Sequence, residues 1–299
     1  MSSVPDSFGG ETSVRLRGGD YEAVFLPGLG MLGASVKHRG AELVSLHGGL
    51  EAYRSGHTTG IPLLAPWANR ISSRRFRAAG VSVNLEGVPL HAGDDGLPRH
   101  GTMGAQPGWQ VVGVKPSSLL ARFAYDTPEL LAAFPFPHEL EVQASLSASG
   151  VRLVTRVRPL GRRSVPVAFG WHPYFTVKGP RERWRLRLPR RTHLALDGRG
   201  IPTGVVAPEP AENEPLRDRG FDDLYSLGRD RRLALEGGGR TIALGFGAGY
   251  PYLQVFAPPG KPFVAIEPMT APTDALVTGA CPVVAPGDTF AAGFTLSAA

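Results

Sequence analysis

The 299-residue sequence contains one cysteine, Cys281, and only 19% charged residues. A single cysteine excludes a disulfide within the chain and a cysteine-based zinc site, and it favours a reducing, cytoplasmic location. Cys281 is therefore expected to be a small buried apolar residue. No apolar run reaches the roughly 18 residues of a membrane helix, and the first ten residues lack a signal peptide's basic and apolar regions. We expect a cytoplasmic protein without a membrane partner.

Lysine is also scarce, so arginine carries most of the positive charge behind a formal net charge of +6. Basic residues gather in short groups at 162–163, 181–191 and 229–232. Acidic residues and prolines interrupt these groups, and no aromatic residues alternate with them. The pattern favours a solvated basic face over a nucleic-acid partner.

Alternation of apolar and polar residues is the dominant pattern of what the sequence does contain. The segment 139–147 has an apolar residue at every second position, and the alternation resumes after Ser149 and Gly150, which predicts a hairpin. The same period appears at 184–188, 242–246 and 290–296. Because 39 glycines and 28 prolines punctuate these runs, we predict an all-β antiparallel sandwich with very little helix.

The one helix that the sequence predicts covers residues 127–133, with Thr127 as its cap and Pro128 in its first turn. The chain shows no repeat and no abrupt change of composition, so we expect a single domain over 13–299. Residues 1–12 are expected to form a flexible tail. The segment 205–219, rich in proline, glutamate and arginine, is expected to be a long exposed loop.

Five polar positions stand out inside segments that are otherwise apolar and rich in proline and glycine, where a charge is unfavourable without a partner or a function. Arg70 either pairs with a carboxylate at a strand end or holds a ligand, and His100 is either a turn residue or part of a site. His172 is either a hydrogen-bonded core residue or an acid with a pKa near working pH. Glu267 ends a buried apolar run, so it either caps something or acts as a base.

The fifth position is the pair Asp222 and Asp223, whose side chains point to opposite faces if the segment is extended. Only one of them can face a shared pocket. Together, one Glu, two His, one Arg and one Asp at element ends suit proton transfer on a hydroxylated ligand.

An ordered set of short motifs resembles the aldose 1-epimerase family, also called galactose mutarotases, over residues 24–296. The motifs are Asn69-Arg70, His100-Gly101, His172-Pro173-Tyr174-Phe175, Phe221-Asp222, Leu253-Gln254-Val255-Phe256 and Glu267-Pro268. The resemblance implies the fold of that family, the large antiparallel β-sandwich known as the galactose mutarotase-like supersandwich. It also implies a small-molecule sugar as substrate and neither a cofactor nor a metal.

The resemblance further implies a role for each matching residue. Glu267 is the expected general base and His172 the expected general acid. The residues expected to hold sugar hydroxyls are Asn69, Arg70, His100, Tyr174, Asp222 and Gln254. Asp222 is preferred to Asp223 because the family's aspartate directly follows an aromatic residue, as Asp222 follows Phe221.

Interconversion of α- and β-anomers requires the hemiacetal ring to open, the bond between C1 and C2 to rotate, and the ring to close on the other face. A carboxylate takes the proton of the C1 hydroxyl while a protonated imidazole donates to the ring oxygen. Mutual attraction is expected to lower the pKa of Glu267 and to raise that of His172. A tryptophan, Trp67 or Trp171, is a further candidate for stacking on the sugar, although tryptophan in such segments is more often core.

Four alternatives remain open from the sequence. In hexose-6-phosphate 1-epimerases an arginine after the His-Gly turn helps to bind phosphate, whereas Thr102 follows here, and only Arg74, Arg75 and Arg77 would replace it. A noncatalytic carbohydrate-binding β-sandwich has no need of both Glu267 and His172. A glycosidase would use Asp222 and Glu267 as its carboxylate pair, and a metal site would use His100 and His172. The natural sugar and the oligomeric state are left undetermined.

Overall fold

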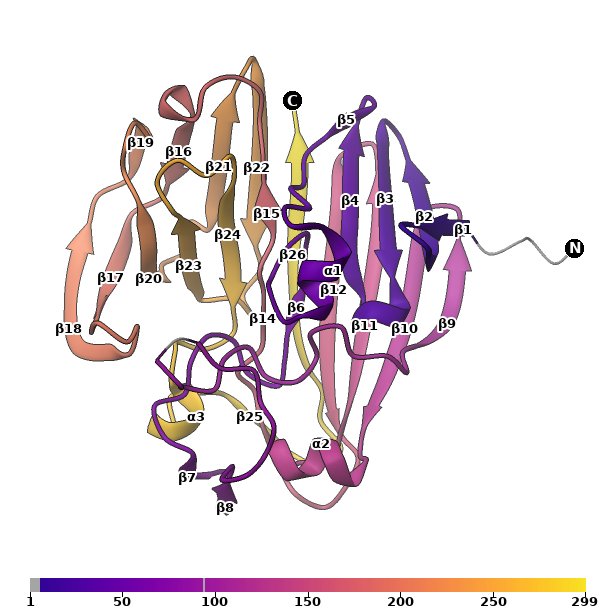
Figure 1. Cartoon of the computed structure of the whole chain (residues 1–299), viewed down its shortest axis with the longest axis vertical. Coiled ribbons are helices and arrows are strands. Elements are labelled where there is room, and N and C mark those ends of the chain that lie inside the picture. The colour runs from indigo at the N-terminus through magenta and orange to yellow at the C-terminus, as the bar shows by residue number, and fades with distance from the viewer. Residues whose placement is uncertain (1–5, 94) are drawn as a thin grey trace, which may run out of the picture.

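The computed structural model describes residues 6–93 and 95–299, and about half of these residues lie in antiparallel β-sheets. A nine-stranded sheet runs across the whole molecule (Figure 1). In spatial order its strands are β19 (Glu212–Pro215), β16 (Arg185–Leu188), β21 (Arg232–Gly237), β22 (Arg240–Phe246), β26 (Phe290–Ala298), β12 (Gly150–Pro159), β11 (His138–Ser147), β10 (Ser118–Tyr125) and β9 (Gln110–Lys115).

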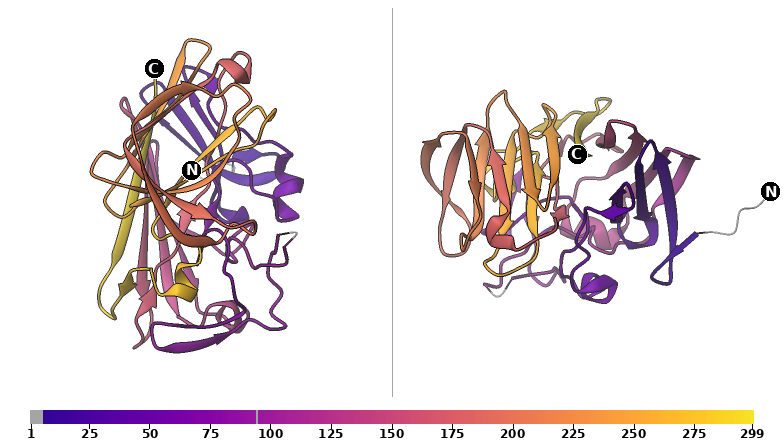
Figure 2. Two further views of the ribbon diagram at one scale, coloured as in Figure 1. Left: turned by 90° about the vertical axis from the view of Figure 1, so that its left-hand side faces the viewer. Right: turned by 90° about the horizontal axis from the view of Figure 1, so that it is seen from above.

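Two further sheets cover this long sheet, one over each half (Figures 1 and 2). The five-stranded sheet consists of β1 (Asp6–Phe8), β2 (Glu11–Gly18), β3 (Tyr21–Leu26), β4 (Leu32–His38) and β5 (Ala41–Glu42). The eight-stranded sheet has the order β18 (Pro202–Glu209), β17 (Arg191–Leu196), β20 (Phe221–Leu227), β23 (Tyr252–Ala257), β24 (Val264–Met269), β14 (Gly170–Trp171) and β6 (Leu63–Leu64), with β15 (Tyr174–Phe175) also paired to β24. The predicted sandwich fold is confirmed.

Short elements and loops close one end of the sandwich. Two small two-stranded sheets lie there, β7 (Arg75–Ala78) with β8 (Val81–Asn84) and β13 (Val165–Pro166) with β25 (Val283–Val284). The α-helices are α1 (Gly49–Arg54), α2 (Pro128–Ala133) and α3 (Ala275–Thr278), and single 3₁₀ turns lie at Pro27–Leu29 and Arg181–Arg183. Among the described residues, no helix combines the length and the apolar character needed to cross a membrane.

The hydrophobic core lies between the layers and explains the alternation seen in the sequence. In β11 and β12, which form the predicted hairpin, Leu140, Val142 and Leu153 point inward and are buried. The main core cluster extends from Leu16 to Leu296 and takes residues from all three large sheets. This continuity supports the proposal of one domain over 13–299.

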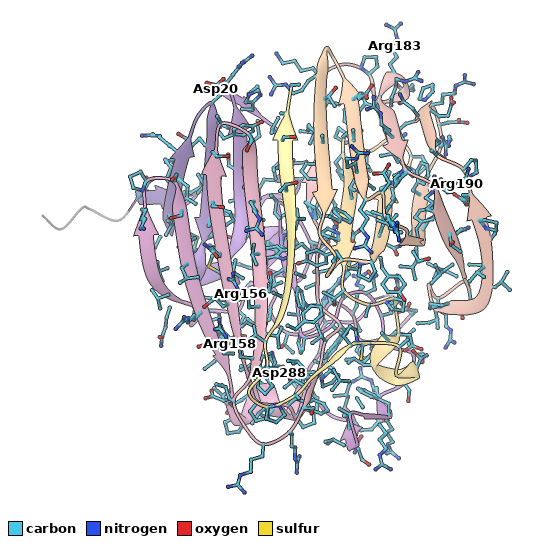
Figure 3. The ribbon with its side chains drawn as sticks, turned by 180° about the vertical axis from the view of Figure 1, so that it is seen from behind. Asp20, Arg156, Arg158, Arg183, Arg190 and Asp288 are labelled. Atoms are coloured by element: carbon cyan, nitrogen blue, oxygen red, sulfur yellow. The ribbon has the colours of Figure 1, made fainter. Side chains whose placement is uncertain are left out.

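The outward-facing side of the same hairpin carries an ion-pair network. Arg156 Nη1 lies 2.9 Å from Glu141 Oε1, and Arg158 Nη1 lies 2.8 Å from Glu139 Oε1. Arg122 on the neighbouring strand β10 also reaches Glu141, at 2.9 Å. Figure 3 shows Arg156 and Arg158 on this outer face. Much of the positive charge here is therefore matched by carboxylates within the fold.

Two expectations from the sequence concern secondary structure. The helix at 127–133 is confirmed as α2, with Thr127 at the N-cap position, although its side chain makes no capping hydrogen bond. The long loop expected at 205–219 is wrong, because β18 and β19 occupy much of it. Both are edge strands of their sheets, where prolines and charged side chains are tolerated because the outer backbone groups need no partner strand.

The N-terminal segment is also more ordered than expected for a tail. Residues 6–8 form β1, which pairs with β2 in the register Asp6 with Ser13. Residues 1–5 of the expected tail lie outside the described residues. Cys281 is only half-buried and packs against the main core cluster, so its side chain is less enclosed than expected.

Candidate active site

Three neighbouring strands of the eight-stranded sheet carry the polar side chains that form one wall of the site. Glu267 on β24 and Gln254 on β23 are direct cross-strand partners, and Gln254 is in turn paired with Leu224 on β20. Asp222 lies two residues before Leu224 and therefore shares its face. Gln254 Nε2 donates a hydrogen bond to Asp222 Oδ1 at 2.8 Å. Strands β20, β23 and β24 are neighbours in the sheet (Figure 1), and their register places all three polar groups side by side.

Tyr174 lies on β15, which pairs with the other edge of β24, and His172 lies in the short link between β14 and β15. Their backbones are held by β6 and the residues before it, since His172 N–H donates to the Pro62 carbonyl and Tyr174 N–H to the Gly60 carbonyl. Two residues apart in an extended chain, the two rings stack with centroids 4.4 Å apart and planes 14° apart. The Tyr174 hydroxyl lies 3.2 Å from His172 Nε2 and 2.6 Å from Thr58 Oγ1.

The Asn69-Arg70 and His100-Gly101 segments lie opposite this wall and support each other. His100 N–H donates to the Asn69 carbonyl, and Asn69 N–H donates to His100 Nδ1 at 3.2 Å, so the proton of the neutral ring is on Nε2. Arg70 pairs with Asp95, with Nε and Oδ2 3.0 Å apart. Arg70 thus has the carboxylate partner of the structural interpretation, while it also borders the cavity described next.

A single cavity of about 570 Å³ brings together every site residue that the sequence analysis selected. Glu267 and His172 lie at its buried end, with exposed fractions of 1% and 5%. Their closest atoms, Glu267 Oε1 and His172 Nε2, are 3.1 Å apart. The eight selected residues that line it are Asn69, Arg70, His100, His172, Tyr174, Asp222, Gln254 and Glu267.

Burial controls the protonation of the two central groups. Loss of hydration, together with the nearby Asp222 carboxylate, raises the pKa of Glu267 well above its usual value. Burial likewise lowers the pKa of His172 to about 3. The expectation that mutual attraction would lower the first pKa and raise the second is therefore wrong for this cavity. Desolvation outweighs the attraction, and the favoured state is a neutral pair.

The match to a family model decides the membership of this chain. The aldose 1-epimerase model matches residues 14–297, nearly the whole sequence. The chain belongs to the aldose 1-epimerase family. A comparison with curated proteins gave no match.

Solved structures agree with this membership at the level of the fold. A galactose mutarotase-like protein from Clostridium acetobutylicum is 18% identical with a TM-score of 0.87, and the match covers 99% of this chain and 98% of that one. The galactose 1-epimerase of Lactobacillus acidophilus NCFM is 13% identical with a TM-score of 0.76 and coverages of 99% and 97%. A GalM/aldose epimerase homologue from C. elegans is 14% identical with a TM-score of 0.81 and coverages of 96% and 98%.

Several buried polar atoms at this cavity have no hydrogen-bond partner in the described part of the chain. They are Asn69 Nδ2, His172 Nδ1, Gln254 Oε1 and Glu267 Oε2. Buried polar groups are normally paired, so a cluster of unpaired donors and acceptors beside a cavity fits a ligand rich in hydroxyls.

The choice between the two adjacent aspartates has a clear geometric outcome. Asp222 lines the cavity. Asp223 lies on the other face of β20, where its Oδ1 is 3.3 Å from His193 Nε2. The alternation of an extended strand therefore separates the two carboxylates, as the sequence pattern predicted.

The structure also corrects the choice of aromatic residues and adds residues that the sequence did not select. Trp67 and Trp171 are fully buried and do not line the cavity, so neither is placed to stack on a sugar. Phe256, which directly follows Gln254-Val255, borders the cavity instead, and the position of Gln254 two residues earlier was the signal that would have found it. The other added lining residues include His47, Thr58, Arg99, Lys261 and Phe263.

No group of three or more His, Cys, Asp or Glu side chains is arranged to hold a metal ion within residues 6–93 and 95–299. His100 and His172 contact each other edge to face, with ring centroids 5.8 Å apart. Burial lowers the pKa of His100 well below its usual value, and the charges of Arg99 and Arg70 act in the same direction, so this ring is neutral at working pH. A neutral His100 suits hydrogen bonding to a hydroxyl.

Proposed function

We propose that this protein is an aldose 1-epimerase, a mutarotase that interconverts the α- and β-anomers of a free aldose such as galactose or glucose. What supports this function most is the contact between His172 Nε2 and Glu267 Oε1 at the buried end of a cavity lined by polar groups. One carboxyl and one imidazole are the two groups that acid–base opening of a hemiacetal requires.

The reaction begins with a proton transfer inside the pair. The neutral pair and the ion pair contain the same number of protons and differ only in whether Glu267 or His172 holds one of them. Sugar hydroxyls that replace water around the pair stabilise the ion pair by hydrogen bonding, so no proton needs to come from solvent. The resulting carboxylate and imidazolium are the base and the acid of the reaction.

Ring opening then moves two protons. Glu267 accepts the proton of the C1 hydroxyl while the C1 oxygen becomes a carbonyl, and the bond between C1 and the ring oxygen breaks. His172 donates its proton to the ring oxygen, which becomes the C5 hydroxyl. After rotation about the bond between C1 and C2, the same transfers run in reverse on the other face, and both groups return to their starting states.

The surrounding side chains hold the sugar in place during this rotation. Asp222 and Gln254 present acceptors and donors along the sheet, and Asn69 and His100 present theirs from the opposite loops. Arg70 orients the substrate without giving up a proton because a guanidinium stays charged.

Polarimetry of freshly dissolved α-D-glucose and α-D-galactose tests the proposal. We expect the wild-type protein to speed the change in optical rotation, and Glu267→Gln and His172→Asn each to lower the rate by about 10² to 10⁴. Asp223→Asn is the matched control, because it removes a carboxylate next to Asp222 but on the other face of β20. Wild-type rates in a folded Glu267→Gln variant would contradict the proposal. Release of an aryl alcohol from an aryl glycoside would point to a glycosidase instead.

A hexose 6-phosphate is the second candidate substrate, and Arg99 is the observation that favours it. Arg99 lines the cavity beside His100, and its Nε atom is buried without a hydrogen-bond partner among the described residues. Arg74, Arg75 and Arg77, the replacements suggested by the sequence, do not line the cavity. A higher kcat/KM for glucose 6-phosphate than for glucose, lost in Arg99→Gln, would favour this candidate.

A further inference from the structure

A second cavity of about 560 Å³ adjoins the candidate active site. It lies between the end of α1, strand β6, the loop 87–91 and helix α2, and its walls are mostly apolar, with Leu64, Leu90 and Leu130 among them. Each cavity is within the size range of pockets that enclose a whole small ligand. The residues that line both cavities are Gly56, His57, Thr58, Arg99 and His100, so the two compartments meet along these side chains.

One of the two segments that form the boundary continues from Arg99 and His100 into a tightly packed turn at residues 101–102. Thr102 N–H donates to the Ala65 carbonyl at 2.8 Å, and the Thr102 hydroxyl lies 3.0 Å from the Tyr125 hydroxyl. Gly101 has a φ of 65°, and a Cβ atom there would lie 2.1 Å from the Ala65 carbonyl oxygen. The turn is therefore packed directly onto β6 and its neighbours, and the second cavity is a built feature of the fold.

The boundary lies on the side of His172, which fixes the direction in which a substrate would extend. The His100 ring contacts the His172 ring edge to face, and Thr58 reaches His172 through the Tyr174 hydroxyl. In the proposed reaction His172 donates to the ring oxygen. In an aldopyranose that oxygen is bonded to C1 and to C5, and C1 is held at Glu267. The group nearest the boundary is therefore C6, which is attached to C5.

We propose that the second cavity is a subsite for a second sugar residue, one joined through O6 of the aldose whose anomeric carbon reacts. This inference rests on the proposed function, because it uses the orientation of the sugar at Glu267 and His172. The carbon-bound hydrogens of a pyranose suit the walls formed by Leu64 and Leu130, and its hydroxyls suit Arg99 and His91. The apolar walls favour a sugar ring over a phosphate in this compartment.

Reducing disaccharides with different linkages test the subsite by polarimetry. Isomaltose and maltose both end in a reducing glucose, but they are joined through O6 and O4 respectively. We expect the wild-type kcat/KM for isomaltose to exceed that for maltose at least tenfold. The position of the linkage, and not the identity of the second sugar, should determine kcat/KM. Melibiose, which is joined through O6 of its reducing glucose, should therefore have a higher kcat/KM than lactose, which is joined through O4.

A variant that fills the second cavity gives the matching structural test. Ala132 is exposed on α2 and lines this cavity only, so Ala132→Trp adds bulk there without disturbing the core. We expect Ala132→Trp to lower kcat/KM for isomaltose at least tenfold. The kcat/KM of the same variant for glucose should stay within twofold of the wild-type value. Ala132→Ser, which adds one atom, should behave as wild type with both sugars.

The outcomes separate the subsite from the proposed function. Equal kcat/KM for isomaltose and maltose, or an equal effect of Ala132→Trp on glucose and isomaltose, would overturn the subsite while glucose mutarotation still supports the function. Turnover of glucose 6-phosphate without turnover of isomaltose would overturn it in favour of a phosphate at Arg99. Failure to speed mutarotation of any monosaccharide would overturn the function itself.

Discussion

The imidazole of His172 and the carboxyl of Glu267 approach to 3.1 Å where both side chains are almost completely buried. Burial drives the pKa of the histidine down and that of the glutamate up, so the pair is neutral before a substrate binds. A buried carboxyl that keeps its proton becomes a strong base once it has lost that proton to its neighbour. The pair is thus suited to passing protons back and forth, which a reaction that is the same in both directions requires.

Glu267→Gln should make the folded protein more stable at neutral pH. An unfolded glutamate loses its proton near pH 4.5, whereas the folded Glu267 keeps its proton to a higher pH. Stability is therefore lost as the pH rises from about 4.5 to the folded pKa, by about 1.4 kcal/mol for each pH unit in that interval. Urea unfolding should give a larger free energy of unfolding for the variant than for wild type at pH 7. This difference should become smaller towards pH 4. A variant that loses stability at pH 7 would contradict this account.

Glu267 and His172 should behave as one unit in a double-mutant cycle. Each single substitution already abolishes the proton transfer between the two groups. The second substitution should therefore lower the rate little further. We expect the Glu267→Gln, His172→Asn double variant to be at most a few-fold slower than the slower single variant. The measurement is kcat by polarimetry, and rate losses that multiply across the cycle would show that the two groups act independently.

The Tyr174 hydroxyl should support the charged form of His172. It lies 3.2 Å from His172 Nε2 and is oriented by Thr58 at 2.6 Å. A hydrogen bond to a charged group contributes roughly 1.5 kcal/mol, which predicts a loss in kcat of about tenfold for Tyr174→Phe. Thr58→Val should lower kcat in the same direction and Thr58→Ser should restore it. If Tyr174 only fills space, the phenylalanine variant will match wild type in kcat at every pH.

The sequence predicted the layered fold and selected eight residues that share one cavity, but it did not predict the protonation of Glu267 and His172. The alternation in β11 and β12 follows directly from a sheet with one buried face, and it is a local signal that spacing carries well. The separation of Asp222 from Asp223 follows from the same rule. The depth at which Glu267 and His172 lie does not, because it depends on loops from residues 47–58 and 99–102 that close over the sheet. Burial, and with it the direction in which both pKa values move, is a tertiary property.

Apart from Phe256 on β23, the added lining residues named above lie outside the helices and strands of the described chain, in segments without a recognisable motif. Thr58 lies in an irregular segment, and nothing in its neighbours marks it as a partner of Tyr174 more than 100 residues away. The segment 205–219 fails for a different reason. Its proline and charge content is typical of loops, yet the edge strands β18 and β19 tolerate the same composition.

Gly101→Ala should destabilise the turn between the two cavities. The substituted residue would need a positive φ, and its Cβ would lie 2.1 Å from the Ala65 carbonyl oxygen, a backbone atom that cannot rotate away. Gly80→Ala is the control, because Gly80 has a similar φ of 80° but open space around it. Both variants carry the conformational strain of a positive φ, and only Gly101→Ala adds the clash. The loss of unfolding free energy, measured in urea, should therefore be about 2 kcal/mol larger for Gly101→Ala than for Gly80→Ala. Equal losses would mean that the turn has room to move.

His138 should make the protein sensitive to acid, independently of the active site. Its ring is buried and stacked on Tyr125, and its Nδ1–H donates to the Phe136 carbonyl at 2.7 Å. Burial lowers the pKa of His138 from 6.5 to about 4. Between pH 6.5 and about pH 4, the unfolded chain therefore binds a proton at His138 that the folded chain does not bind. The free energy of unfolding falls as the pH falls through this interval.

Between pH 7 and pH 5 this single histidine should remove about 2 kcal/mol of stability. His138→Asn keeps a donor near the Phe136 carbonyl but cannot be protonated. The variant loses packing at every pH, so the informative quantity is the difference in unfolding free energy between pH 7 and pH 5. That difference should be about 2 kcal/mol smaller than in wild type, while the contributions of His100 and His172 cancel because both proteins retain them. An unchanged difference would mean that the pKa of His138 is the same in the folded and the unfolded chain.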